Sequence, residues 1–540
     1  MKLVLIQPPV QDFYDTTIRL QPIGLAYLKG AMKKHLPEWE VVIKDFHQGW
    51  GRRTIALPKE LAYLKDYYPW PDQSPFSLFH HYYHFGASFE TIAREVACEK
   101  PDLVGISSLF SPYYREVLKC AESIKKQIDC PIVIGGSHCS ALPELMLRHP
   151  AVDWVIRGEG ERPLVELIKA WSSGQGLEGV QGLGYKKDGR LFLNPPGVSF
   201  PIEELPIPDL SDLALETYTY EKRPLCFIMT SRGCPHQCSF CSVHTTFPGY
   251  RRRSVQDVFE EIRLRYQEGY RVFDFEDDNL TFDQEEVKNL CEKLGRAFPP
   301  GEIELLAMNG ISYQSLDSEL LISMKETGFT HLNLSLVSSS PVIRREALRP
   351  QGMKHYLTVV HEAFRLGFKI VSYQILGLPG EPLNSMIRTL QVNSQLPVLL
   401  GASPFYLTPG TPIAQKFPEP TEADVLKSRL TAMVIETDDF KREDIYTLFA
   451  ATRMINFFKG LRFQDPTINL NTALGIARKG GRRSALGAEI FEKLLTEGRL
   501  YAATQEGYRD LPRFRADLFS DLWSRLDHIK TQEGRIVKTS

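Results

Sequence analysis

The chain has 540 residues, 43% of them hydrophobic and 24% charged, which is typical of a globular protein with several domains. A formal net charge of -2 gives no electrostatic reason to expect nucleic acid or an anionic membrane as a partner. No stretch approaches the roughly 18 apolar residues of a membrane span, so no membrane span is expected.

The first residues and the cysteines indicate a compartment. The apolar run from Leu3 to Ile6 is too short for a signal peptide and is followed by two prolines. Nine cysteines in 540 residues do not suggest a disulfide framework. We therefore expect a cytoplasmic protein.

Residues 1–200 alternate short apolar runs with segments of helical length. The runs indicate buried strands at Leu3 to Ile6, Val41 to Ile43, Leu103 to Ser107, Ile132 to Ile134 and Trp154 to Ile156. This pattern predicts a doubly wound, Rossmann-like parallel α/β domain. An aromatic-rich insertion at about 51–92 could wall a cavity, or it could pack on the sheet as a separate hydrophobic cluster.

Ligands of such sheets bind at the carboxyl ends of the strands, so the loops there are the candidate site. The small and polar residues of these loops are Ser107, Ser108, Gly135, Gly136, Ser137, Gly158, Glu159 and Gly160. Together the loops resemble the cobalamin-binding domain that precedes many radical S-adenosylmethionine (SAM) enzymes. The resemblance implies that these residues bind cobalamin, with the first two loops lining the site of its nucleotide tail. Glycines after strands also serve tight turns in any Rossmann-like sheet.

A histidine ligand to cobalt is not expected. The run from Asp45 to Gly49, with His47, approximates the D-x-H-x-x-G motif of other cobalamin proteins, but its glycine comes one residue too early. The run also follows the second strand, whereas that motif follows the first. The loop after the first strand, Pro8 to Leu20, contains no histidine.

Residues 201–221, with three prolines among acidic and short apolar residues, read as a linker. The following segment, 222–418, contains Cys234, Cys238 and Cys241 in a C-x3-C-x2-C triplet. Thiolates are soft ligands suited to iron–sulfur clusters, and three of them leave the fourth iron of a 4Fe-4S cube open. With Phe240 before the last cysteine, the triplet resembles the signature of the radical SAM superfamily. That resemblance implies a cluster that binds SAM at its open iron and cleaves it reductively to a 5′-deoxyadenosyl radical.

An alternative for the triplet is a structural zinc site, because His244 follows at a spacing that could complete a Cys3His tetrahedron. Such sites mostly organise small domains that lack a core of their own, and this chain is long enough to have one. If the triplet binds zinc, the alternative function is a zinc-stabilised corrinoid-binding protein without enzymatic activity.

Six strand candidates in 222–418 match the open (β/α)6 barrel of radical SAM enzymes. They are Phe227 to Thr230, Val272 to Phe275, Glu304 to Ala307, Leu332 to Leu336, Ile370 to Leu376 and Pro404 to Leu407. Barrel enzymes carry functional groups at the carboxyl ends of their strands. The resemblance implies that SAM is bound there by Phe240, Glu276, Asp277, Asp278, Asn279, Ser335, Ser338, Gly377 and Leu378. Next to a cluster, the basic run from Arg251 to Arg253 is expected to offset negative charge.

Residues 419–540 follow helical periodicity, contain no cysteine and read as a helical domain that could close the barrel mouth. The whole chain therefore resembles a cobalamin-dependent radical SAM enzyme, with a methyltransferase acting on an unactivated carbon of a small molecule as the leading interpretation. An oxidoreductase or ring-forming cyclase without methyl transfer is the alternative. The electron donor implied is a flavodoxin or ferredoxin. No residue identifies the substrate or a catalytic acid or base.

Overall fold

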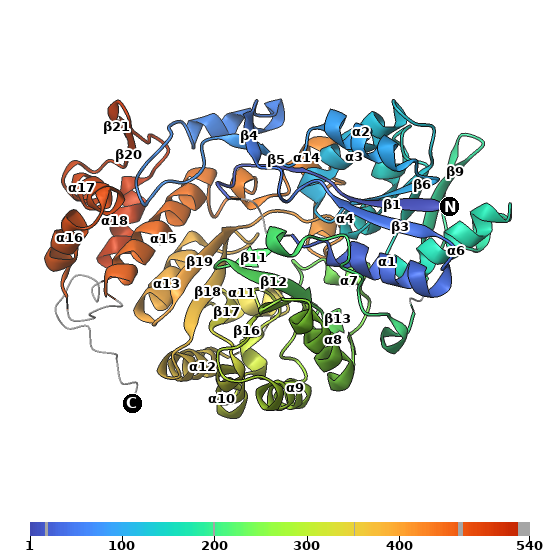
Figure 1. Ribbon diagram of the computed structural model, residues 1–540. Helices are drawn as coiled ribbons and strands as arrows, with labels where there is room; N and C mark the ends of the chain where they lie inside the picture. The colour runs from blue at the N-terminus through green and yellow to red at the C-terminus, as the bar shows by residue number, and fades with distance from the viewer. Residues whose placement is uncertain (17–19, 198–199, 350–351, 463–467, 527–540) are drawn as a thin grey trace.

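The amino-terminal domain is built on one sheet with the strand order β10-β9-β8-β7-β6-β1-β3 (Figure 1). The computed structural model describes residues 1–16, 20–197, 200–349, 352–462 and 468–526. Strands β3, β1, β6, β7 and β8 run parallel, while β9 and β10 add an antiparallel hairpin at one edge. The strands are β1 (Lys2–Gln7), β3 (Glu40–Asp45), β6 (Leu103–Ser107), β7 (Ile132–Gly135), β8 (Trp154–Ile156), β9 (Leu183–Lys187) and β10 (Arg190–Leu193). The predicted α/β fold is confirmed; the hairpin was not predicted.

Helices cover both faces of this sheet because each carries an apolar stripe that must be buried. Helices α1 (Ile23–His35) and α6 (Glu161–Ser172) contribute to the core on one face. Helices α2 (Phe89–Glu99) and α3 (Tyr114–Lys125) contribute to the core on the other. The strand order reverses between β1 and β6, and ligands of open parallel sheets bind at such a reversal.

The aromatic insertion packs as a hydrophobic cluster, but against the carboxyl-terminal helices instead of the amino-terminal sheet. It contains β4 (Arg52–Ile55), β5 (Tyr82–Phe85) and the 3-10 helix η1 (Lys59–Asp66); β2 (Val10–Asp12) joins β5 and β4 in a small antiparallel sheet. Figure 1 shows the chain after β4 running across the top of the molecule toward α15. Buried aromatic rings of the insertion share one core with α15 and α17. These rings therefore form part of the core of a lobe that consists of the insertion and the carboxyl-terminal helices.

The central domain is a partial barrel. Strands β12, β15 and β16 form one parallel set and β17, β18 and β19 a second, and a parallel bridge from Leu305 to Phe329 connects the two. The strands are β12 (Arg223–Ile228), β15 (Val272–Phe275), β16 (Glu304–Leu306), β17 (His331–Val337), β18 (Lys369–Leu376) and β19 (Leu399–Pro404). The first strand begins earlier than predicted. The prediction of the last strand at 404–407 is wrong, because residues 399–404 are the ones that pair with β18, and the apolar Phe405 follows in the loop.

The carboxyl-terminal region is helical with one β-hairpin. Its elements include α15 (Arg442–Arg462), α16 (Leu470–Lys479), α17 (Arg482–Glu497), β20 (Tyr501–Thr504), β21 (Gly507–Asp510) and α18 (Ala516–Ser524). The hairpin was not predicted; its Ala503 amide donates to Asp72 of the insertion over 2.9 Å. In the described part of the chain, no helix is both long and apolar enough to cross a bilayer.

Candidate active site

The cysteine triplet lies on a loop that two short strands close at its base. Strand β13 (Ser231–Arg232) pairs antiparallel with β14 (Arg251–Arg252), so residues 233–250 leave and return at one point beside the end of β12. Gly233 has a φ of +78°, and a Cβ there would lie 1.8 Å from the carbonyl oxygen of Gly249. Only glycine therefore allows the chain to turn into the loop so tightly.

Two polar side chains from other elements reach the cysteines. The Asn279 amide nitrogen lies 3.6 Å from Sγ of Cys234, and Nη1 of Arg349 lies 3.9 Å from Sγ of Cys238. Burial raises the pKa of Cys241 to about 11, so in the free protein this thiol keeps its proton at neutral pH. A bound metal would displace that proton, because thiolate is the form that binds.

His244 does not join the cysteines. Its Nε2 lies 2.7 Å from the carbonyl oxygen of His236, within hydrogen-bond distance. Among the described residues, no three Cys, His, Asp or Glu side chains are arranged to hold a single metal ion. The Cys3His zinc geometry is therefore not assembled here. Three thiols form a soft donor set of the kind that iron–sulfur clusters use.

The acidic turn after β15 is attached to the cysteine loop. Asp277 is buried and accepts hydrogen bonds from the Thr230 amide and hydroxyl and from the Ser231 hydroxyl. Its carboxylate therefore braces the base of the loop, although the sequence predicted contact with SAM. Asp278 accepts from the Gly233 amide over 3.0 Å, and burial raises its pKa to about 6.

Asn279, in the same turn, keeps an acceptor that a ligand could use. Its Oδ1 is buried and has no hydrogen-bond partner among the described residues, while its amide nitrogen already contacts Cys234. Glu276 lines the cavity described below. A buried acceptor next to the first cysteine fits a ligand that donates hydrogen bonds, such as an ammonium group.

An apolar cluster lies at the ends of β17, β18 and β19. Leu378 packs there with residues that include Val337 and Phe405, and Phe240 of the cysteine loop packs against them. Gly377 has a φ of +86°, so the backbone turns sharply at the end of β18. Phe240, Gly377 and Leu378 are thus brought together beside the cysteines, as a site for a flat apolar group requires.

Ser335 and Ser338 lie in different surroundings. Ser335 is half-buried on β17. Ser338 is fully buried and donates from Oγ to Oε1 of Glu381 over 2.6 Å, so its hydroxyl faces a polar network below the barrel mouth. The pairing register of β17 shifts between Ser335 and Val337, and a bulge of this kind redirects the residues that follow it.

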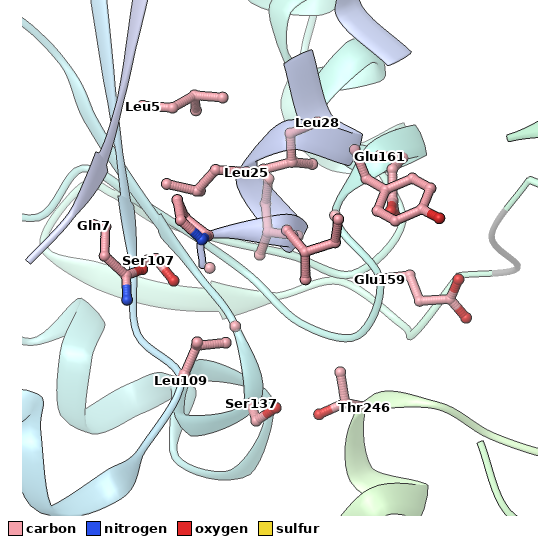
Figure 2. Close-up of a pocket in the computed structure, with 18 of the residues that line it drawn as sticks. Leu5, Gln7, Leu25, Leu28, Ser107, Leu109, Ser137, Glu159, Glu161 and Thr246 are labelled. Atoms are coloured by element: carbon pink, nitrogen blue, oxygen red, sulfur yellow. The ribbon is translucent and has the colours of Figure 1, made fainter. Parts of the chain in front are cut away.

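A cavity of about 350 Å³ opens where the amino-terminal domain meets the barrel (Figure 2). Of the residues predicted to bind cobalamin, Ser108 alone is not among its lining. Ser107, Gly135, Gly136, Ser137, Gly158, Glu159 and Gly160 line it together with Glu276 and Asp278 of the barrel. Figure 2 shows Ser107 and Ser137 on the ribbon of the amino-terminal domain and Thr246, which follows the cysteines, on the ribbon of the barrel.

The glycines shape this cavity into a cradle. A Cβ at Gly135 would approach nothing closer than Ile156 at 3.8 Å, and one at Gly24 would meet nothing within 4 Å, so side chains there would project into open space. Gly136, with a φ of +120°, lies so close to the Ser108 carbonyl that a Cβ would be 2.5 Å from its oxygen. Apolar walls with two serines suit the tail of a large cofactor. No histidine is among the described residues that line the cavity.

The basic run is used for packing the domains. Arg251 pairs with Glu159 of the amino-terminal domain. Arg253 is buried and pairs with Glu261 at 2.5 Å and Asp257 at 2.7 Å. The prediction that these cations offset charge at the cluster therefore fits neither of them. Arg349, which was not predicted, is a cation that lies beside a cysteine of the triplet; its signal in the sequence is an arginine-rich segment after β17.

The family model of the radical SAM superfamily matches residues 228–392, and that of the B12 binding domain matches residues 79–168. The chain therefore contains a radical SAM domain and a B12-binding domain. The cofactors that these two domains imply are a 4Fe-4S cluster, SAM and cobalamin.

Relatives match this chain over most of its length. An uncharacterized methyltransferase of Pyrococcus horikoshii is 28% identical over 74% of this chain and 79% of its own. The cytidylyl-2-hydroxyethylphosphonate methyltransferase of Streptomyces wedmorensis is 27% identical over 71% and 75%. The structure of the radical SAM methyltransferase TsrM from Kitasatospora setae, with cobalamin and a [4Fe-4S] cluster bound, superposes with a TM-score of 0.58 at 17% identity, covering 77% of this chain and 74% of that one. At that identity, the likeness to TsrM shows the shared fold.

Proposed function

We propose that the protein is a cobalamin-dependent radical SAM methyltransferase that methylates an unactivated carbon of a small molecule. The observation that carries the proposal is the shared cavity. The predicted cobalamin loops line one wall and the acidic turn beside the cysteines lines another, so the two proposed cofactor sites would open into one space. The relatives named as methyltransferases support this reaction over cyclisation.

The residues divide between the cofactors as follows. Cys234, Cys238 and Cys241 would hold three irons of the cluster, and Arg349 stands beside Cys238. The free Oδ1 of Asn279 would accept from the SAM ammonium group together with Glu276. Phe240, Gly377 and Leu378 would pack against adenine, with Ser335 near the ribose.

The amino-terminal loops would hold the cobalamin tail. Ser107 and Ser137, which line the cavity together with Gly135 and Gly136, would donate hydrogen bonds to it. When bound, the cluster with SAM supplies a 5′-deoxyadenosyl radical that removes a hydrogen atom, and cobalamin supplies the methyl group. The protein's part is to bind both groups and to exclude water from the space between them.

Two finer points belong to the same proposal. The electron would come from a flavodoxin or ferredoxin, because reductive SAM cleavage needs a low-potential donor. A cytoplasmic location is supported by nine cysteines that are all free.

The test uses the full-length protein, reconstituted anaerobically with iron and sulfide. With SAM, hydroxocobalamin and a reductant it should form 5′-deoxyadenosine, and with a metabolite extract and methyl-labelled SAM it should yield a labelled product. Cys238→Ala should abolish both, whereas Cys291→Ala, which removes a buried thiol of the helix α9 (Gln284–Ala297), should keep the cluster. A labelled product identifies methyl transfer; an unlabelled product that depends on 5′-deoxyadenosine would favour the cyclase or oxidoreductase instead.

A further inference from the structure

An ion-pair cluster joins the cofactor-bearing loops of the two domains. Arg232 lies on β13, directly before the cysteine loop, and its side chain is 5% exposed. Its Nη1 lies 2.6 Å from Oε2 of Glu159, and its Nη2 lies 2.5 Å from Oε1 of Glu161. Both glutamates follow β8 in the amino-terminal domain. One guanidinium group therefore holds two carboxylates of the other domain.

The ion-pair cluster is balanced in charge, and three of its four side chains, those of Arg232, Glu159 and Glu161, are buried. Arg251, opposite Arg232 on β14, is the second partner of Glu159. Two positive and two negative groups therefore neutralise one another. Although burial alone would raise the pKa of Glu161, the charge and hydrogen bond of Arg232 hold it below its ordinary value, so the carboxylate stays ionised. The Arg232 guanidinium also lies over the rings of Tyr27 and Phe247, 5.2 and 5.6 Å from their centroids.

The ion-pair cluster lies between the two predicted cofactor sites. Glu159, Glu161 and Arg232 all line the shared cavity, between the loops of the predicted tail site and the segment that carries the cysteines. Arg232 is two residues from Cys234, and Glu159 is flanked by Gly158 and Gly160, which leave its loop few side-chain contacts of its own. Any displacement of one loop must therefore move or break the buried ion pairs. Breaking a buried ion pair is costly because it leaves an uncompensated charge. The two loops should therefore become ordered, or lose their order, together.

We propose that Arg232, through Glu159 and Glu161, is a positioning residue that couples the order of the cysteine loop to occupation of the tail cavity. Assembly of the iron–sulfur cluster would fix residues 233–250 and hold Arg232 in place. Arg232 would in turn preorganise residues 157–161 for cobalamin. The coupling is reciprocal, because a binding free energy shared between two sites acts equally in both directions. This inference rests on the cofactors of the proposed function.

The experiment measures the dissociation constant of hydroxocobalamin by absorbance titration, for the apo protein and for the cluster-loaded protein. Cluster loading should tighten binding about fivefold or more in the wild type, which is the lower end of usual coupling between sites. Glu161→Gln, which keeps the shape but removes one charge, should reduce this ratio to less than about twofold. Arg232→Lys, which keeps the charge but not the fork that reaches both carboxylates, should give an intermediate ratio.

The matched control is Asp212→Asn. Asp212 pairs with Lys29 of α1 at 2.6 Å and thus also ties a linker to the amino-terminal domain, but it touches neither loop. This variant can lose stability yet should keep the full coupling ratio. Equal dissociation constants for apo and cluster-loaded wild type, or an unchanged ratio in Glu161→Gln, would overturn the proposal.

A second readout keeps the test independent of cobalamin. Cluster assembly should slow amide hydrogen exchange in residues 157–164 of the wild type and leave it unchanged in Glu161→Gln. If no form of the protein binds cobalamin, the proposed function fails, and this exchange measurement still decides whether Arg232 couples the loops. If amide exchange in residues 157–164 of the wild type is the same with and without the iron–sulfur cluster, the two loops are not coupled.

Discussion

Nη1 of Arg349 lies 3.9 Å from Sγ of Cys238, which makes it a cation in contact with a predicted cluster ligand. A positive charge and a hydrogen bond at a cluster sulfur both favour the reduced, more negative form. Arg349→Met should therefore lower the reduction potential of the reconstituted cluster by roughly tens of millivolts, measured by EPR-monitored redox titration. Arg345→Met, an exposed arginine four residues earlier, is the control. Equal potentials in all three proteins would show that Arg349 does not act on the cluster.

His244 provides a test between cluster and zinc. Because its Nε2 contacts the carbonyl oxygen of His236, His244→Ala should leave the iron and sulfide content per chain unchanged. A fourth zinc ligand, by contrast, would be essential to binding. Metal analysis after reconstitution checks this, and loss of the metal in His244→Ala would support the zinc interpretation.

Gly135 tests the tail cavity. Gly135→Leu should weaken cobalamin binding by about 100-fold or more, because the new side chain would occupy the cradle while its Cβ meets only Ile156 at 3.8 Å. Absorbance titration gives the affinity, and circular dichroism checks the fold. Gly295→Leu, on the exposed side of α9 (Gln284–Ala297), adds the same bulk elsewhere and should bind cobalamin normally. Unchanged affinity in Gly135→Leu would place cobalamin outside this cavity.

Phe79 tests whether the insertion is structural. Its ring packs against those of Phe13, Tyr68 and Phe449, with the nearest centroid 5.5 Å away, and only 8% of the residue is exposed. Phe79→Ala should lower the free energy of unfolding by about 3–5 kcal/mol in denaturant titrations. Trp70→Ala, at 39% exposure, should cost much less. A stable Phe79→Ala that loses activity alone would instead make the ring part of a substrate wall.

Glu381 gives stability a pH dependence. Burial raises its pKa to about 7, although Ser338 and Ser385 donate hydrogen bonds to it. Because the folded pKa lies above the unfolded one, its contribution to stability is full below about pH 4.5 and is lost as the pH rises through about 7. Glu381→Gln should therefore reduce the loss of stability between pH 5 and 8, by up to roughly 3 kcal/mol.

Denaturant titrations of both proteins across that range measure the effect. Glu116 must be considered in the same data, since burial also raises its pKa to about 7 and it would leave a residual slope in the variant. Parallel curves for the wild type and Glu381→Gln would show that Glu381 is ionised at little cost.

The sequence predicted features that depend on local pattern. Apolar runs located the amino-terminal strands, and the cysteine spacing located the functional loop that follows β12. It did not predict that Asp277 faces inward or that Ser338 is buried, because the first depends on hydrogen bonds from Thr230 and the second on a bulge in β17. Arg349 and the partners of Glu159 were not predicted either, because contacts between residues far apart in the chain produce no local pattern in the sequence.

The shared lobe of insertion and carboxyl-terminal helices also sets an order of events during synthesis. The Tyr63 hydroxyl donates to the carbonyl of Ala432, which is 369 residues later. At 5–20 residues per second, the ribosome needs roughly 20–70 s to make the intervening chain. During that interval the insertion lacks α15 and α17, which complete the core around its rings. Chains that stop before α15 should therefore expose these rings and aggregate or be held by chaperones, even though their amino-terminal sheet is complete.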